Sequence, residues 1–409
     1  MTLAEATTVY DLFAPEALHN PYPLYQRMRA EDPVHLAGRY GFWVLTRYRD
    51  VAAALRDARL SSDRRPIYAQ QLRGLDLGLI QNFLRLTDRM ILVKDPPEHT
   101  PMRKIANAGF TARALASWPP IVHEVTNRLL DAVERQGRMD IVSDLAVGLP
   151  AQIISDIFGV PRPDRPQFLQ WGTDVATFFG VATSDNIEAV ARTADTAAAA
   201  FQAYLEQLIA ERRRRPGSDM VSLLIAAYEQ SGADIGELPA LCALILNAGW
   251  LTTTDLIANG VNALLRHPDQ WHKLKENPTL IGSAVEEIAR FDTATQFPRR
   301  TAREDLMIGD RLIPAGSVVA LGLGAANHDP EVFAVPEAFD ITRTPNPHLT
   351  FGHGVHFCLG AVLARMELTA CFEALARRMP EMRFDPDRET IPRRTSLSFK
   401  GFERLPVRF

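Results

Sequence analysis

The residue with the clearest chemistry is Cys358, which follows a glycine-rich run. Segment 351–360 reads FGHGVHFCLG, and the residues that follow it, AVLARME, have helical character. A cysteine just before a helix meets unpaired backbone N–H groups and the positive end of the helix dipole, which favour a thiolate. Gly354 and Gly360 let the backbone pass close to a flat group and let N–H groups approach the sulfur. The segment therefore predicts a metal-bound sulfur at a helix start.

Other interpretations of Cys358 fit the sequence less well. A cysteine can simply be a small buried residue, but the whole pattern around Cys358 would then be a coincidence. A structural zinc site needs further Cys or His ligands at short spacing, and His353 and His356 do not complete a tetrahedral set. A cysteine nucleophile needs a base and an oxyanion site, for which the sequence offers no case.

The segment resembles the haem-binding loop of the cytochromes P450. The family pattern FxxGxxxCxG is matched at Phe351, Gly354, Cys358 and Gly360, and the resemblance runs from about Asn20 onward. It implies a haem b cofactor with Cys358 as the axial thiolate, which favours cleavage of the O–O bond. It also implies a mainly α fold with small β-sheets, in which the haem lies between a long central helix and the helix that follows the cysteine loop.

A second feature of the family is an ExxR motif, matched by Glu287 and Arg290 in the run Glu287-Ile288-Ala289-Arg290. Residues three apart lie on one helical face, so this acid and base can pair. In the family the pair is buried and locked by a further arginine, here Arg343. Because a buried pair mainly fixes geometry, we interpret it as structural, holding the loop that carries Cys358.

Haem propionates need positively charged or N–H donors. His99 and Arg103 are four residues apart and therefore share a helix face. The resemblance adds Arg300 and His356 as the other two propionate donors. Each of these residues, taken by itself, would be an ordinary solvated surface group.

Residues Leu238 to Leu265 read as one long helix, apolar in its first half. Ala248-Gly249 interrupts it, and an interior glycine costs roughly 1 kcal/mol relative to alanine, so a groove for dioxygen would explain it. The family pattern Ala/Gly-Gly-x-Asp/Glu-Thr-Thr/Ser is matched at Ala248, Gly249, Thr252 and Thr253. The resemblance implies that Thr252 handles protons and hydrogen-bonds dioxygen.

The acid of this pattern is missing, because Leu251 stands in its place. A carboxylate next to the threonine normally relays protons from bulk water, which leucine cannot do. Asp255, one turn further along the helix, is a candidate replacement, although it could equally be a satisfied helix residue facing solvent. Two alternatives stay open: the substrate brings its own carboxyl group, or the enzyme uses peroxide or nitric oxide. The retained Thr252 weighs against peroxide or nitric oxide.

Strand-like patches occur at Val34 to Leu36, at Phe42 to Leu45 and again after Phe291. The segment from about Leu60 to Val93 has weak periodicity and predicts a long, partly irregular loop that contacts substrate. The resemblance adds a set of mostly apolar residues to this pocket, which predicts a small, mainly hydrophobic substrate. These residues are Phe178, Phe179, Ile245, Ala248, Thr252, the segment 295–297 and Leu397.

The composition is that of a globular protein, with 46% hydrophobic and 23% charged residues. A net charge of -4 gives no indication of nucleic acid or an anionic membrane as a partner. The N-terminus lacks a signal-peptide pattern, no run approaches eighteen uninterrupted apolar residues, and three cysteines are too few for a disulfide framework. We therefore expect a cytoplasmic protein that does not span a membrane.

We expect residues 1–409 to form a single domain, with 1–15 loosely ordered, and we see no fused reductase. The resemblance implies that electrons come from a ferredoxin or flavodoxin. Lys104, Arg365, Arg377 and Arg378 could form a basic face for such an acidic partner. A non-enzyme alternative, a haem-based ligand sensor, has no need of Thr252 beside a dioxygen groove.

Overall fold

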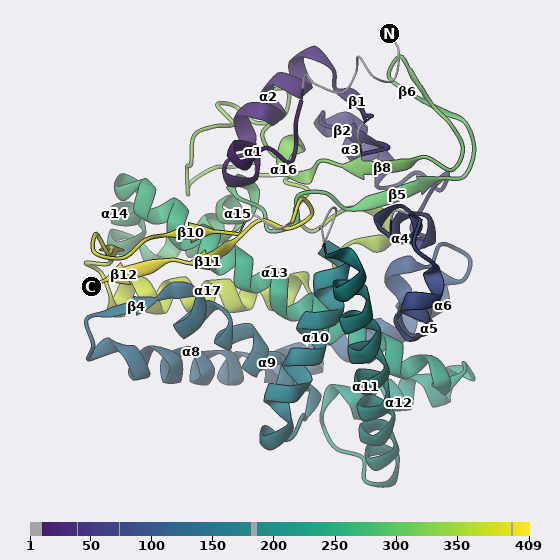
Figure 1. The fold of residues 1–409 in the computed structure, drawn as a ribbon. Helices are drawn as coiled ribbons and strands as arrows, with labels where there is room; N and C mark the ends of the chain where they lie inside the picture. Colours follow the sequence, from purple (N-terminus) through teal and green to yellow (C-terminus); the bar gives the residue numbers. More distant parts are fainter. Residues whose placement is uncertain (1–9, 39, 73, 181–185, 394–395) are drawn as a thin grey trace. The chain divides into compact units, whose positions relative to one another are not determined.

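The computed structural model describes residues 10–38, 40–72, 74–180, 186–393 and 396–409. Figure 1 shows the helices and strands of the chain, which divides into two compact units. The first unit comprises Met1–Leu60, Val122–Pro150 and Leu251–Phe409, and the second comprises Ser61–Ile121 and Ala151–Trp250. Residues 1–9 of the expected N-terminal segment 1–15 lie outside the described residues.

Helices dominate the chain and the β-sheets are small, which confirms the expected fold class. The long helix predicted at Leu238 to Leu265 is present as α13. The helices are α1 (Pro15–His19), α2 (Tyr22–Glu31), α3 (Tyr48–Ala54), α4 (Arg65–Gln71), α5 (Gln81–Thr87), α6 (His99–Asn107), α7 (Ala112–Ser117), α8 (Pro119–Glu134), α9 (Gly148–Phe158), α10 (Arg165–Gly180), α11 (Ile187–Arg214), α12 (Met220–Ser231), α13 (Leu238–Arg266), α14 (Pro268–Glu276), α15 (Ile281–Phe291), α16 (Leu323–Ala326) and α17 (Ala361–Arg378).

The ends of several helices follow from local sequence. At the start of α12 the side chain of Asp219 accepts a hydrogen bond from the backbone N–H of Ser222, which satisfies a donor that the helix leaves unpaired. The same helix ends at Gly232, whose φ of 70° is a conformation that glycine adopts without strain. The run Arg212 to Arg214 occupies the last turn of α11, where positive charge stabilises the carbonyl end of the helix dipole.

The strands predicted near the N-terminus are confirmed as β1 (Val34–Ala37) and β2 (Phe42–Leu45). They pair antiparallel and belong to a sheet with the order β1-β2-β8-β5-β3, in which β2 and β8 are parallel. The other strands of this sheet are β3 (Leu60–Ser61), β5 (Arg299–Ala302) and β8 (Val318–Leu321). Smaller sheets join β4 (Arg138–Asp140), β12 (Pro406–Arg408) and β9 (Arg383–Phe384), then β10 (Ile391–Pro392) with β11 (Phe402–Arg404), and β6 (Leu306–Ile308) with β7 (Arg311–Ile313).

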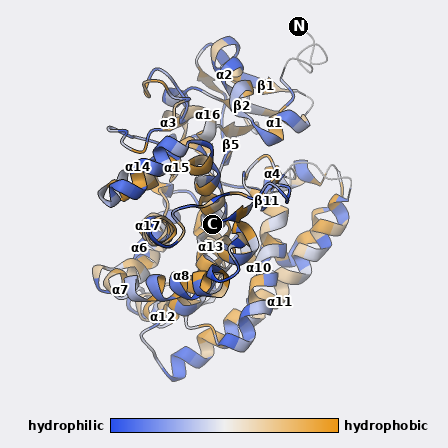
Figure 2. Cartoon of the chain, turned by 90° about the vertical axis from the view of Figure 1, so that its left-hand side faces the viewer, coloured by the Kyte–Doolittle hydropathy of each residue, from blue (hydrophilic) through white to orange (hydrophobic). Residues whose placement is uncertain are grey.

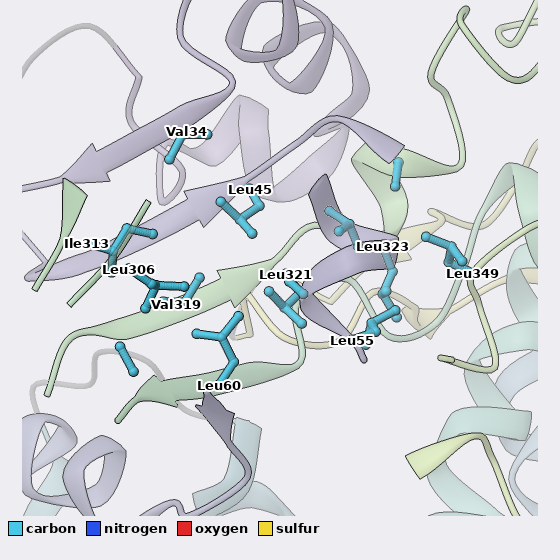
Figure 3. Close-up of a cluster of buried hydrophobic side chains, with 14 residues drawn as sticks. Val34, Leu45, Leu55, Leu60, Leu306, Ile313, Val319, Leu321, Leu323 and Leu349 are labelled. Carbon is cyan, nitrogen blue, oxygen red and sulfur yellow. The ribbon is translucent and has the colours of Figure 1, made fainter. Parts of the chain in front are cut away.

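A cluster of buried aliphatic side chains covers the five-stranded sheet of the first unit (Figure 3). Leu45 from β2, Val319 and Leu321 from β8 and Ile313 from β7 have no exposed surface. Leu323 and Leu349 extend the cluster toward the segment that leads to Cys358. Burial of this apolar area therefore fixes the sheet and the approach to the cysteine loop together.

The second unit is built around α10 and α11, which pack against each other. Helix α11 carries hydrophilic and hydrophobic residues along its length (Figure 2), as expected of a helix with one buried face. Phe168 of α10 and Phe201 of α11 meet edge to face at 5.0 Å. Nearer the start of α11, Asp195 accepts hydrogen bonds from the backbone N–H groups of Asn82 and Phe83 at the start of α5.

The prediction of a long irregular loop from Leu60 to Val93 is wrong for much of that segment. Helices α4 and α5 form within it, and its described residues bury Tyr68 and Phe83. These rings contact Phe178 at centroid distances of 5.7 and 5.0 Å. Tertiary packing of aromatic residues therefore supplies the helical order that the weak sequence periodicity did not show.

Two stretches of the described residues, Ile141–Phe158 and Ile235–Arg266, are long and apolar enough to cross a membrane by length and composition alone. Each is 67% buried within the protein, which is the burial expected of a core helix. The second stretch contains α13, whose apolar character is therefore explained by packing.

Gly260 marks the closest approach of α13 to two other helices. A Cβ atom there would lie 2.5 Å from the Phe372 ring of α17 and 2.8 Å from Ile288 of α15. We expect Gly260→Ala to lower the free energy of unfolding by about 1–3 kcal/mol, because this core has no room for a methyl group. Chemical denaturation followed by circular dichroism measures the change.

The matched control is Gly282→Ala in α15, where a Cβ atom meets nothing within 4 Å. This substitution should raise the free energy of unfolding by about 0.5–1 kcal/mol, because alanine restricts the unfolded helix segment. Equal effects of the two substitutions would contradict the close packing of α13, α15 and α17.

Candidate functional site

Cys358 lies between a short turn of 3₁₀-helix, Gly354–His356, and the first residue of α17. Its backbone N–H donates to the carbonyl of Phe351 at 2.9 Å, which closes the loop on itself. Gly354 has a φ of 73°, and a Cβ atom there would lie 3.0 Å from the carbonyl oxygen of Leu55. Glycine is required at this position for both conformation and space.

The three cysteines, all within the described residues, differ sharply in environment and form no disulfide. Cys242 and Cys371 are fully buried. Burial raises the pKa of the Cys371 thiol to about 12, and it raises the pKa of Cys242 further. Cys358 is only half-buried. Of the three, Cys358 therefore has the environment of a thiolate ligand.

Glu287 and Arg290 form a two-point ion pair within α15. Arg290 Nε and Nη2 donate to the two carboxylate oxygens at 2.8 Å each, and neither side chain has exposed surface. The structure also brings Arg343 to this pair, with its Nε 3.1 Å from Glu287 Oε2. Asn346 Nδ2 and the backbone N–H of Asp340 donate to the same carboxylate at 3.1 and 3.0 Å.

The remaining donors of Arg290 bind the chain that precedes the cysteine loop. Nη1 donates to the carbonyls of Asn327 and Pro336 at 2.9 Å, and Nη2 donates to Ala338 at 3.1 Å. Removing one partner of a buried pair generally costs about 3–5 kcal/mol, because the other charge is left without compensation. This network therefore fixes the segment 327–346 against α15, and Cys358 follows twelve residues later.

The four predicted propionate donors fall in both units. In the second unit, His99 is buried in the first turn of α6, and Arg103 lies one turn on and is half-buried. Burial, and then the charge of Arg103, lowers the pKa of His99 below its ordinary value. In the first unit, Arg300 is buried in β5 and His356 is half-buried in the turn before Cys358.

Helix α13 is buried on both sides of a short opening. Leu241, Ala243 and Leu246 are buried before it, as is the run from Thr253 to Val261 after it, but Ala248 is exposed. Gly249 and Thr252 are half-buried. This interruption of burial occurs at the residues matched to the Ala-Gly-x-x-Thr pattern, and Thr253 beside them is buried.

Gly249 does not owe its small size to packing within its own unit. A Cβ atom there would lie 3.5 Å from Ile154, an ordinary contact distance. The dioxygen groove at Gly249 stays a prediction.

Asp255 is fully buried and pairs with Arg393, a partner that the sequence reasoning missed. Arg393 donates to the two carboxylate oxygens at 2.9 and 2.7 Å. Gly401 is adjacent, and a Cβ atom there would lie 2.1 Å from Asp255 Oδ1. Burial raises the pKa of Asp255 to about 6, against the opposing charge of Arg393. The alternative in which Asp255 faces solvent is therefore wrong.

Two of the four cations proposed as a basic docking face are already paired. Arg378 binds Glu134 at 2.7 Å and Asp131 at 2.6 Å. Arg365 binds Glu286 at 2.5 Å. The structure thus contradicts a free basic cluster of all four residues, although Lys104 and Arg377 are exposed, each in its own unit.

The predicted pocket residues Phe178 and Phe179 also differ from each other. Phe178 is fully buried among the Tyr68 and Phe83 rings and is a core residue. Phe179 is half-buried, with the Arg64 guanidinium 5.6 Å from its ring centroid. Of this pair, only Phe179 keeps surface with which to contact a substrate.

The residues around Cys358 fit a haem. A Cβ atom at Gly360, two residues after Cys358, would meet nothing within 4 Å, so the space beside this glycine is open. Cys358 offers a soft thiolate ligand, and the described residues contain no cluster of three or more His, Cys, Asp or Glu side chains that could hold a metal ion instead. A single thiolate ligand suits an iron whose four equatorial ligands come from a porphyrin.

Comparisons with known proteins agree with this site. The family model for cytochrome P450 matches residues 38–399, and the chain belongs to the cytochrome P450 family. It is 38% identical to the biotin biosynthesis cytochrome P450 of Bacillus subtilis over the whole of both chains, and 37% identical to the vitamin D(3) 25-hydroxylase of Pseudonocardia autotrophica over 98% of this chain and 96% of the relative.

Solved structures lead to the same class. The crystal structure of P450BioI in complex with hexadec-9Z-enoic acid ligated acyl carrier protein superposes with a TM-score of 0.89 at 37% identity, covering 97% of this chain and 100% of that one. CalO2 gives a TM-score of 0.89 at 30% identity, covering 98% and 99%. The protein is therefore a cytochrome P450 monooxygenase, an oxidoreductase that carries haem iron with a cysteine thiolate as axial ligand.

Proposed function

We propose that Cys358 is the thiolate ligand and that the enzyme inserts one oxygen atom from dioxygen into a mainly apolar small molecule. The observation that carries this proposal is the interruption of burial in α13, where Ala248 is exposed and Thr252 is half-buried, whereas the run from Thr253 to Val261 is buried. An enzyme that uses dioxygen needs a hydroxyl at this place to move protons. Electrons would come from a separate ferredoxin or flavodoxin.

We propose the following roles for the other residues. The bound haem supplies the activation of dioxygen, and Thr252 holds and passes a proton at its Oγ1. Glu287, Arg290 and Arg343 keep the segment before Cys358 in place. His99, Arg103, Arg300 and His356 supply the donors for the two propionates.

We propose that residues 1–409 work as a single catalytic domain in the cytoplasm. Support comes from the family match over residues 38–399 and from the coverage of whole solved P450 chains. The expected substrate is a mainly hydrophobic small molecule. Relatives are named for biotin, vitamin D(3) and polyketide metabolism.

A carboxylate or carrier-bound acyl substrate is a second candidate. Leu251 stands where the family usually has an acid, and a related structure holds a fatty acyl group on an acyl carrier protein. A substrate of this kind would bring its own polar group to the site, and its aliphatic chain would occupy the apolar part of the pocket.

The decisive experiment is turnover of the purified holoenzyme with a ferredoxin, its reductase and isotope-labelled dioxygen. The substrates are a free long-chain fatty acid, its methyl ester and the same acyl group on acyl carrier protein. We expect one labelled oxygen atom in the product, with the preferred polar end identifying the substrate class. Turnover that proceeds only with added peroxide, or without incorporation from dioxygen, would overturn the proposed reaction.

Asp255 is proposed to deliver protons to Thr252 in place of the acid missing at Leu251. Asp255 lies three residues after Thr252 in α13, and its carboxyl group is fully buried. Its raised pKa of about 6 allows proton exchange near neutral pH. The bond to Arg393 holds the carboxyl group in one place, which a relay also requires.

We predict that Asp255→Asn lowers kcat on the order of 100-fold, because proton delivery contributes a factor of this size. The same substitution should increase the release of hydrogen peroxide.

Arg393→Gln should instead shift the acidic limb of the pH–rate profile to higher pH, because loss of the positive charge raises the pKa of Asp255 above about 6. Kinetics and peroxide yield from pH 5 to 9 measure both, in roughly half-unit steps.

The pair of variants separates a relay from an anchor. If Asp255 only holds Arg393 and the strand β10 that precedes it, the two substitutions break the same contact and must give the same loss at every pH. That outcome would rule out the relay.

A further inference from the structure

Glu286, the residue before Glu287, makes an ion pair of its own that leads to the cysteine loop. Arg365 of α17 donates to both of its carboxylate oxygens, with Nε 2.5 Å from Oε1 and Nη2 2.8 Å from Oε2. The fork of a guanidinium matches a carboxylate in this two-point geometry. The bond therefore joins α15, which carries Glu287, to the helix that follows Cys358.

The same guanidinium lies over the Phe351 ring, 4.3 Å from its centroid. This is a cation–π contact in a partly buried place, where such contacts are stronger than at the surface. Phe351 is the first residue of the loop, and its carbonyl accepts the hydrogen bond from the backbone N–H of Cys358 at 2.9 Å. A single side chain thus links the cysteine loop to α15.

His348 completes the environment of Glu286. The backbone N–H of Thr350 donates to His348 Nδ1 at 3.3 Å, so Nε2 carries a hydrogen and donates to Glu286 Oε2 at 3.0 Å. Burial by itself would raise the pKa of Glu286, but the hydrogen bonds from Arg365 and His348 outweigh it and bring the pKa down to about 2. Glu286 is therefore an anion throughout the working pH range.

Arg365 is also close enough to Cys358 for their charges to interact. The hydrogen bond that Arg365 donates to Glu286 is the main reason that the pKa of Arg365 is raised, and the charges of Glu286 and Cys358 add to it. Arg365 is seven residues after Cys358 and lies in the second turn of α17. The charge of the thiolate therefore interacts with a cation whose charge is balanced by Glu286.

We propose that Arg365, held by Glu286, is a positioning residue that fixes Phe351 at the start of the cysteine loop and tunes the electrostatic potential at the sulfur of Cys358. The inference rests on the proposed role of Cys358 as the haem ligand. Charges and hydrogen bonds around a ligating thiolate set the reduction potential of its metal. Arg365 and Glu286, with opposite charges, then act on this potential with opposite signs.

The test uses the holoenzyme and four variants: Arg365→Gln, Arg365→Lys, Glu286→Gln and the double variant with both glutamine substitutions. The readouts are the ferric–ferrous midpoint potential and the Soret band of the ferrous carbon monoxide complex. Arg128→Gln is the matched control, because Arg128 pairs with Glu124 on the exposed face of α8 in the same unit.

We expect the midpoint potential to fall in Arg365→Gln, because Glu286 is left as an unbalanced negative charge, and to rise in Glu286→Gln. In the double variant it should return toward the wild-type value. Arg365→Lys keeps the charge but loses the planar contact with Phe351. It should hold the potential near wild type while a larger fraction of the carbon monoxide complex loses its thiolate-type band. Arg128→Gln should change neither readout.

Shifts of the same sign in the two single variants, or no shift in either, would overturn the electrostatic role. If one single variant does not retain haem, the other single variant and the double variant still give the sign of the change in midpoint potential. Failure of the underlying function is distinguishable, because the wild-type protein would then lack the thiolate-type band altogether.

Discussion

The buried ion pair of Glu287 and Arg290 is the interaction on which the position of Cys358 depends. Both side chains are fully excluded from water, and their hydrogen bonds extend to Arg343 and to carbonyls of the segment 327–346. Buried pairs of this kind add little net stability compared with apolar packing, but they tolerate few alternative geometries. We infer that the pair is there to fix a path of the chain, since the stability of the unit already comes from the apolar cluster over the five-stranded sheet.

Two neighbouring glutamates on α15 bind two consecutive parts of the chain around Cys358. Glu287 holds the segment that approaches the cysteine loop, and Glu286, through Arg365 and Phe351, holds the loop itself. Both carboxylates belong to one helix, and Gly260 lets α13 pack directly against α15 and α17. A displacement of α15 would therefore also move Cys358. The position of Cys358 is therefore set by the packing of α13, α15 and α17 and by the polar contacts of Glu286 and Glu287.

Local patterns in the sequence predicted what depends on neighbours along the chain. These include the cysteine loop, the strands at Val34 and Phe42, and the extent of α13. The contact of Arg343 with Glu287 was expected from the family resemblance, but other contacts between distant residues escaped prediction. Arg393 is 138 residues from Asp255, and only the cost of burying Asp255 without a partner indicated that a cation was needed. The helices between Leu60 and Val93 were missed because they are stabilised by Phe178 and Asp195, far along the chain.

The most direct test of Cys358 as the thiolate ligand is the ferrous carbon monoxide spectrum of Cys358→His, compared with Cys371→Ser. Histidine keeps a ligand for iron while removing the sulfur, and Cys371 is a buried thiol with its pKa raised to about 12. The account predicts that Cys371→Ser retains the red-shifted Soret band of a thiolate-ligated haem and that Cys358→His binds haem without that band. A Cys358→His protein that kept the band would show that another sulfur is the ligand.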